Sequence, residues 1–157
     1  MELLNENGKR IVRLNESDFR NIVRNIVNEV LDRKQIKVLW LDDLREPENY
    51  LKKKPDKQEG ALYNNISFYN QFKTQYEPRF VWVKNFDEFT DYILKNGVPE
   101  FVSFDHDLGK GLKKGAECAA WLKDYCKQNG LPLPKYYAHS ANRNGRDTIN
   151  SIMSGNY

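Results

Sequence analysis

The stretch IKVLWLDD, residues 36–43, is a short apolar run that ends in two acidic residues. A run of this length and composition is typical of a strand buried in a parallel sheet. Three further stretches have the same character, namely RFVWVKN (79–85), EFVSFDHD (100–107) and KYYAHS (135–140). We therefore predict four strands, each of which ends in polar side chains.

Helical patterns follow the last three of these strands. They are FDEFTDYILKNG (86–97), KKGAECAAWLKDYCKQNG (113–130) and the shorter GRDTINSIM (145–153). The first two end at a glycine, which is a common helix C-terminus. Strands that alternate with helices predict an α/β fold with a doubly wound, mostly parallel, four-stranded sheet. The simplest strand order, numbered along the chain, is 2-1-3-4.

The segment LNESDFRNIVRNIVNEVLDR, residues 14–33, has the periodicity of an extra N-terminal amphipathic helix. Asn15 is a suitable N-cap, with Asp18 three residues further on. We expect the apolar stripe to pack on its own domain. Alternatively, residues 15–33 bind a protein partner or a second copy of the chain. The apolar positions are Phe19, Ile22, Val23, Ile26, Val27, Val30 and Leu31.

We divide the chain into an N-terminal tail and helix, residues 1–34, and one α/β domain, residues 35–157. A polar stretch with scattered aromatic residues, 44–79, separates the first two strands and is long for a connection. We interpret it as an insertion that covers the site as a lid, with residues 64–75 as its helical part.

The composition fits a water-soluble domain. The charged fraction is 30% and the formal net charge is +3, which permits an anionic ligand without requiring one. No apolar run approaches the roughly 20 residues that a membrane-spanning helix needs. The first residues lack the apolar core of a signal peptide. We therefore expect a cytoplasmic protein with no membrane association.

Ionisable side chains gather where three of the four predicted strands end. The carboxyl ends of parallel strands lie on one edge of the sheet, where open α/β sheets bind their ligands. Both histidines of the chain are in this set, so we predict a functional site rather than a row of turn residues. The set consists of Asp42, Asp43 and Arg45 after the first strand, Asp105, His106 and Asp107 after the third, and His139, Ser140, Asn142 and Arg146 after the fourth.

Two kinds of chemistry suit this set, and the residues alone do not choose between them. In one, Asp42, Asp43 and Asp105 hold a divalent cation such as Mg²⁺ or Mn²⁺, which relieves their mutual repulsion. In the other, His106 and His139 act as general acid and general base across a phosphodiester.

Further residues would support either scheme. Asp105 and Asp107 would orient the imidazole rings, while Arg45 and Arg146 would hold the phosphate. The loop GKGLKKG (109–115) adds backbone N–H groups and three lysines, which suit an anion.

With these motifs in place, the chain resembles the cyclic-phosphate processing receiver domains. The resemblance is carried by LWLDDLREP (39–47), SFDHDLG (103–109) and HSANRNGR (139–146), and it covers roughly residues 37–153. It implies a receiver-like sandwich that hydrolyses or binds cyclic phosphates of nucleotides or RNA ends. The chain lacks the fifth strand and lysine of ordinary receivers, so phosphorelay signalling is not expected. Arg143 stands where the family often has proline.

Our leading hypothesis is a phosphodiesterase that acts on a cyclic phosphate through His106, His139 and the acidic cluster. Asp105 and Asp107 belong to its catalytic group, and the substrate contacts are Arg45, Gly109, Ser140, Asn142 and Arg146. One alternative is a binding protein that sequesters a cyclic nucleotide without cleaving it. Another is a component of a virion or complex that docks through its N-terminal helix.

The N-terminal stretch RLNESDFRNIVRNIVNEVL (13–31) also resembles leader segments that precede unrelated proteins of crAss-like phages. This resemblance implies a phage-encoded protein that acts in the host cytoplasm or is packaged in the virion.

Overall fold

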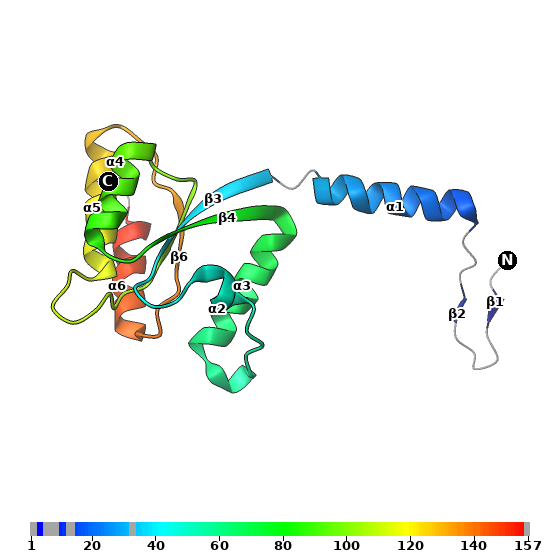
Figure 1. Cartoon of the computed structure of the whole chain (residues 1–157), viewed down its shortest axis with the longest axis horizontal. Helices are drawn as coiled ribbons and strands as arrows, with labels where there is room; N and C mark the ends of the chain where they lie inside the picture. The colour runs from blue at the N-terminus through cyan, green and yellow to red at the C-terminus, as the bar shows by residue number, and fades with distance from the viewer. Residues whose placement is uncertain (1–2, 5–9, 12–14, 32–33, 156–157) are drawn as a thin grey trace. The chain divides into compact units, whose positions relative to one another are not determined.

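The computed structural model (Figure 1) describes residues 3–4, 10–11, 15–31 and 34–155. The chain forms two compact units, Met1–Arg33 and Lys34–Tyr157, a division one residue before the one expected from the sequence. None of the helices in these ranges is long and apolar enough to cross a membrane.

The first unit contains a short antiparallel ladder and one long helix. Strands β1 (Leu3–Leu4) and β2 (Arg10–Ile11) pair with each other, and α1 spans Glu16–Leu31. Asn15 caps α1 as predicted: its Oδ1 atom accepts the Asp18 N–H at 2.8 Å, and Asp18 returns a bond to the Asn15 N–H.

The apolar stripe of α1 is exposed over the residues whose side chains are described. The exposed fractions run from 41% to 58%. That this stripe packs on its own domain stays a prediction, and Val30 and Leu31 lie outside the described side chains. The exposed residues are Phe19, Ile22, Val23, Ile26 and Val27.

The second unit is built on one parallel sheet. Its strands are β3 (Lys34–Leu41), β4 (Tyr76–Val83), β5 (Phe101–Phe104) and β6 (Lys135–Ala138). They lie in the order β4-β3-β5-β6 and all pair in parallel. This confirms the predicted α/β class and the predicted strand order 2-1-3-4.

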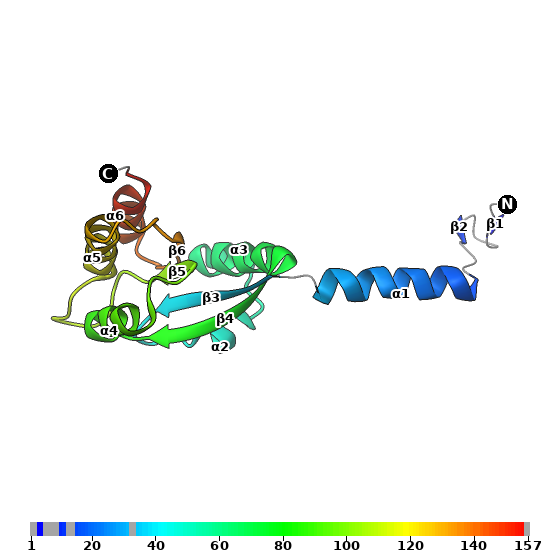
Figure 2. The same cartoon turned by 90° about the horizontal axis from the view of Figure 1, so that it is seen from above.

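Helices cover both faces of the sheet, as Figures 1 and 2 show. One face carries α2 (Pro47–Leu51) and α3 (Ala61–Gln75), and we call it the α2–α3 face. The other carries α4 (Phe86–Asn96), α5 (Gly115–Gln128) and α6 (Arg143–Ser154), and we call it the α4–α6 face.

Alternation along the strands divides the core between these faces. Val38 and Trp40 of β3 pack toward the α2–α3 face, whereas Leu39 and Leu41 pack toward the α4–α6 face. All four side chains are at most 1% exposed. Burial on both faces explains why the strand reads as a continuous apolar run.

The structure differs from the expected lid over residues 44–79. This stretch contains α2, a short 3-10 turn (Lys57–Glu59) and the 15-residue helix α3. Three of its side chains pack against the α2–α3 face of the sheet and are at most 9% exposed, namely Ile66, Tyr69 and Phe72. Most of the stretch is thus the ordinary crossover between two parallel strands, held by aromatic side chains at helical spacing.

Candidate functional site

A cavity of about 450 Å³ opens at the carboxyl edge of the sheet. Seven of the residues predicted from the sequence line it, and four others, Asp42, His106, His139 and Arg146, do not. Sequence reasoning did not single out Leu44 or Ala141, whereas Lys110 and Lys114 belong to the loop 109–115 that it expected to suit an anion. The predicted residues in the lining are Asp43, Arg45, Asp105, Asp107, Gly109, Ser140 and Asn142.

Asp42 lies directly below the cavity, fully buried at the end of β3. Its Oδ1 atom accepts the backbone N–H groups of Leu44 and Arg45 at 3.0 and 2.7 Å. Its Oδ2 atom accepts Arg45 Nε at 2.7 Å and His139 Nε2 at 3.0 Å. A carboxylate has about four lone-pair positions, so the hydrogen-bonding capacity of Asp42 is filled.

These bonds also set the ionisation of Asp42. Burial by itself opposes the charged form, but the hydrogen bond from His139 and those from Arg45 outweigh it and lower the pKa of Asp42. Asp42 is therefore an ionised anchor for the loop above it rather than a proton donor.

His139 is fully buried directly after β6, on the α2–α3 face of the sheet. Its ring stacks on Trp40 with a centroid separation of 3.9 Å and an interplanar angle of 19°. Nδ1 lies 2.7 Å from the Ser103 hydroxyl, and Nε2 bonds Asp42. Because the ionised Asp42 can only accept, we assign the ring proton to Nε2 and the Ser103 proton to the bond with Nδ1.

Burial lowers the pKa of His139 although the neighbouring Asp42 favours the charged form. We therefore treat His139 as neutral. Both of its nitrogens are occupied and no part of it reaches the cavity, so the structure places this histidine beneath the site.

Arg45 joins the first and third strands across the cavity floor. Its guanidinium donates through Nε to Asp42 and through one terminal nitrogen to Asp105 at 2.5 Å. Three of its five N–H donors lie outside these two bonds. Arg45 is 28% exposed, so it can meet an anion from the cavity while it ties two buried carboxylates together.

Two indole groups fix the loop that carries these residues. Trp40 Nε1 donates to the Arg45 carbonyl at 2.9 Å, and Trp82 Nε1 donates to the Asp42 carbonyl at 2.6 Å. The backbone of residues 42–45 is thus held from two strands.

Asp43 is the carboxylate of this loop that faces the cavity. Burial raises its pKa, and the negative charges of Asp42 and Asp105 raise it further. A carboxylate in this position binds a proton more readily than a free one, which is a property of general bases.

The far wall of the cavity is tied down by Asp107. Asn142 donates to Asp107 Oδ2 at 3.1 Å and Lys114 pairs with Oδ1 at 3.0 Å, and these bonds lower the pKa of Asp107. Asn142 also caps α6 by accepting the Gly145 N–H. We expected Arg146 to hold the phosphate. Instead, it donates to the carbonyl of Ser140 at 2.6 Å and stabilises the loop between β6 and α6.

His106 occupies a separate environment against the first turn of α6. A Cβ atom on Gly145 would lie 2.2 Å from His106 Cγ, so this close packing requires glycine. The Nδ1 atom of His106 is buried and has no hydrogen-bond partner in the part of the chain that the structure describes. His106 is partly exposed but does not line the cavity.

The acidic cluster fits a divalent cation only in part. Carboxylate oxygens of Asp42, Asp43 and Asp105 lie within 4.8 Å of one another. However, the lone pairs of Asp42 are all used, and Arg45 fills the space between Asp42 and Asp105. Asp43 and Asp105 keep lone pairs, so these two are the residues that would hold Mg²⁺ or Mn²⁺ together with water or phosphate oxygens.

The buried neutral His139 predicts a specific loss of stability in acid. A group whose pKa is lowered on folding contributes stability above its unfolded value, 6.5 for histidine, and loses it as the pH falls below that value. The lowered pKa of Asp42 also stabilises the fold, and this contribution is lost only as the pH falls below 3.8, outside the range in which histidine titrates. We expect the Tm to fall between pH 7 and pH 5, with a smaller fall in the His139→Gln variant. Parallel Tm curves for the two proteins would contradict this assignment.

The sequence matches one family model, described as the cyclic-phosphate processing receiver domain, over residues 37–155. The matched range includes every strand of the parallel sheet except the first residues of β3, and all residues that line the cavity. No curated protein matches the chain.

Proposed function

Because the chain belongs to the cyclic-phosphate processing receiver domain family, we propose that it hydrolyses a cyclic phosphate of a nucleotide or of an RNA end. One observation carries the proposal. The cavity at the carboxyl edge combines three cationic side chains with a carboxylate whose pKa is raised. The cations suit a phosphate and the carboxylate suits proton transfer to or from water.

The cationic side chains provide the phosphate contacts in this proposal. Arg45 has unused N–H donors, and Lys110 and Lys114 come from the loop before α5. Ammonium and guanidinium groups bind phosphate oxygens through charge-assisted hydrogen bonds. Leu44 is 81% exposed at the same cavity and offers an apolar surface to the base or ribose.

Asp43 is the general base in this proposal. It takes a proton from a water molecule whose oxygen forms a bond to phosphorus. The bond from phosphorus to one ribose oxygen breaks, and that oxygen keeps the electron pair. That ribose oxygen then takes a proton from the Lys114 ammonium, which lines the same cavity. In the alternative scheme Asp43 and Asp105 would hold a divalent cation instead, and the cation would neutralise charge on the phosphate.

The histidines have supporting roles in this scheme. His139 holds Asp42, Asp42 holds Arg45, and Arg45 meets the phosphate, so His139 is a positioning residue. We assign no proton transfer to His106, because its ring packs on Gly145 and does not line the cavity.

The Asp43→Asn variant tests the proposal. With a 2′,3′-cyclic nucleotide and an RNA that ends in a cyclic phosphate, we expect the wild-type protein to form a linear monoester. The variant should be slower by about 100-fold or more, because it lacks the base. Its Tm at pH 7 should rise, because ionised Asp43 is repelled by Asp42 and Asp105. Mass spectrometry of the product and thermal denaturation measure the two effects.

The matched control is Asp56→Asn, which removes an exposed carboxylate at the 3-10 turn, outside the cavity lining. It should leave the rate unchanged. Equal rates for Asp43→Asn and the wild type would contradict the role of Asp43.

A second candidate function is sequestration of the same ligand without cleavage. It is favoured by the positions of His106 and His139, because neither of the two expected acid–base groups lines the cavity. Recovery of intact cyclic nucleotide from denatured protein would support sequestration, whereas a linear product supports hydrolysis.

The amphipathic pattern of α1 favours an additional docking role. Residues 15–33 would then bind a protein partner or a second copy of the chain. The phage origin and the cytoplasmic or virion location implied by the resemblance of this segment belong to the same proposal.

A further inference from the structure

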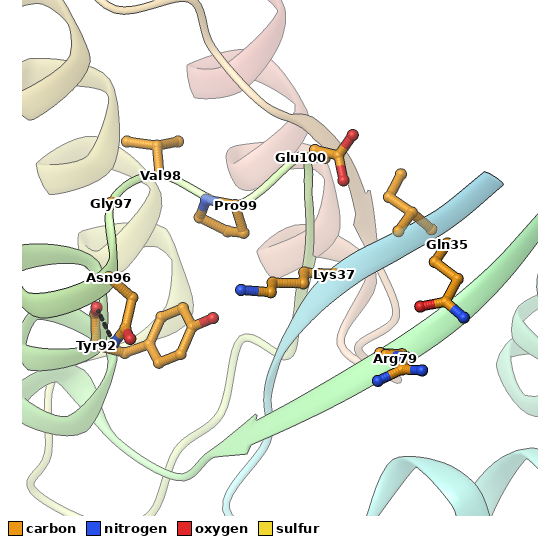
Figure 3. A pocket seen from close by; sticks show the side chains of 10 residues that line it. Gln35, Lys37, Arg79, Tyr92, Asn96, Gly97, Val98, Pro99 and Glu100 are labelled. Atoms are coloured by element: carbon orange, nitrogen blue, oxygen red, sulfur yellow. Dashed lines mark hydrogen bonds between the residues drawn. The ribbon is translucent and has the colours of Figure 1, made fainter.

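A second cavity, of about 470 Å³, lies at the opposite edge of the sheet (Figure 3). The start of β3, the middle of β4, the end of α4 and the loop before β5 form its walls. All of these elements belong to the second unit, and the chemistry proposed above uses none of the lining residues.

Two cationic side chains stand next to each other on one wall. Lys37 and Arg79 are register partners on the neighbouring strands β3 and β4, and both are exposed. Paired residues of adjacent strands project from the same face, with their strands about 5 Å apart. Like charges placed directly opposite are unfavourable. Among the described residues, neither Lys37 nor Arg79 forms a salt bridge that would offset this repulsion.

Glu100 is the one carboxylate in the lining. Its Oε1 atom is paired with Lys34 Nζ at 2.5 Å, and this hydrogen bond lowers the pKa of Glu100. The positive charge of Lys37 also lowers the pKa of Glu100, so Glu100 lies close to two lysines and cannot balance Arg79 as well.

The opposite wall is aromatic and apolar. Tyr92 is half-buried and projects from α4 toward the strands, and Figure 3 shows the Lys37 ammonium pointing toward it. Asn96 donates through Nδ2 to the Tyr92 carbonyl at 2.9 Å, which orients its amide and leaves Oδ1 as an acceptor. Val98 and Pro99 complete this wall.

We propose that this cavity is a second ligand site, which binds a mononucleotide. Lys37 and Arg79 hold the phosphate, and an arginine fork matches phosphate geometry. The ring of Tyr92 packs against the base, whose edge can donate to Asn96 Oδ1. A volume of about 470 Å³ lies within the range of small-molecule sites, and an anion between the two cations removes their repulsion.

Isothermal titration with AMP tests the site on the full-length protein. We expect AMP to bind the wild-type protein and adenosine to bind at least about tenfold more weakly, because each charged contact contributes about that factor. Lys37→Ala and Arg79→Ala should each weaken AMP by about tenfold. Inorganic phosphate should bind through the cations but more weakly than AMP, and Tyr92→Leu should reduce AMP binding without affecting phosphate.

The matched control is Lys95→Ala, which removes a lysine of the same helix that pairs with Asp91 and does not line the cavity. It should bind AMP like the wild type. Lys114→Ala separates the two sites, because it alters the carboxyl-edge cavity and should leave AMP binding here intact. No AMP binding at millimolar concentration, or equal affinity in Lys37→Ala, Arg79→Ala and the wild type, would overturn the proposal.

Discussion

Replacement of His139 by alanine is expected to destabilise the second unit by about 3–5 kcal/mol, the range for a large buried ring that leaves a cavity. The ring is fully buried, stacks on Trp40 and fills hydrogen-bonding positions of Asp42 and Ser103. Its removal leaves two buried polar groups without their partner, which adds to the cost of the cavity. Urea denaturation monitored by circular dichroism measures the change.

His139→Gln separates packing from catalysis. A glutamine amide can donate to Asp42 and accept from Ser103, so this variant should recover much of the stability. If His139 only positions the site, the pH dependence of kcat should keep its shape in His139→Gln while the rate falls modestly. A lost limb of the pH profile would show instead that His139 transfers a proton in the reaction.

Replacement of Arg45 by alanine is expected to have a comparable effect on stability and a larger one on ligand binding. Asp42 and Asp105, which are both buried, would each lose their cationic partner. Removal of one partner from a buried ion pair typically costs about 3–5 kcal/mol. The phosphate would also lose its contact on the cavity floor, so cyclic-nucleotide affinity should fall at least about tenfold.

Two further variants make this result specific. Arg45→Lys keeps the charge but cannot bridge both carboxylates in the same way, so it should recover only part of the stability. Arg143→Ala removes a largely exposed arginine whose distance to Asp147 is 4.0 Å, and it should change stability by less than about 0.5 kcal/mol. Wild-type affinity in Arg45→Ala would remove the phosphate role of Arg45.

The strand order could be predicted from the sequence because the central strands, β5 and the second half of β3, are buried on both faces and read as apolar runs. The alternation of strands and helices then leaves few topologies. The 44–79 stretch was harder to interpret because polar residues separate its aromatic positions. Phe68, Tyr69 and Phe72 fall on the buried side of α3, but the same residues also fit a mobile loop that stacks on a base.

The site could be located from the sequence, but the roles of its residues could not be assigned. Asp105 and His106 are neighbours in sequence, yet one lines the cavity and the other packs on Gly145. Likewise, His139 follows β6 at a point that side chains of α2 and α3 cover, and no local sequence pattern reveals that these helices lie there. Whether a polar side chain at a strand end faces solvent or core depends on tertiary packing.

The two indoles that hold residues 42–45 give the protein an optical reporter of its own site. Trp40 and Trp82 each donate their ring N–H to a carbonyl of this loop, and the chain has three tryptophans in total. The third, Trp121, lies in α5, where its ring stacks on Tyr125. Two of the three emitters of intrinsic fluorescence therefore lie on strands that hydrogen-bond to the loop with Asp43 and Arg45, so occupancy of the carboxyl-edge cavity can be followed without any attached dye.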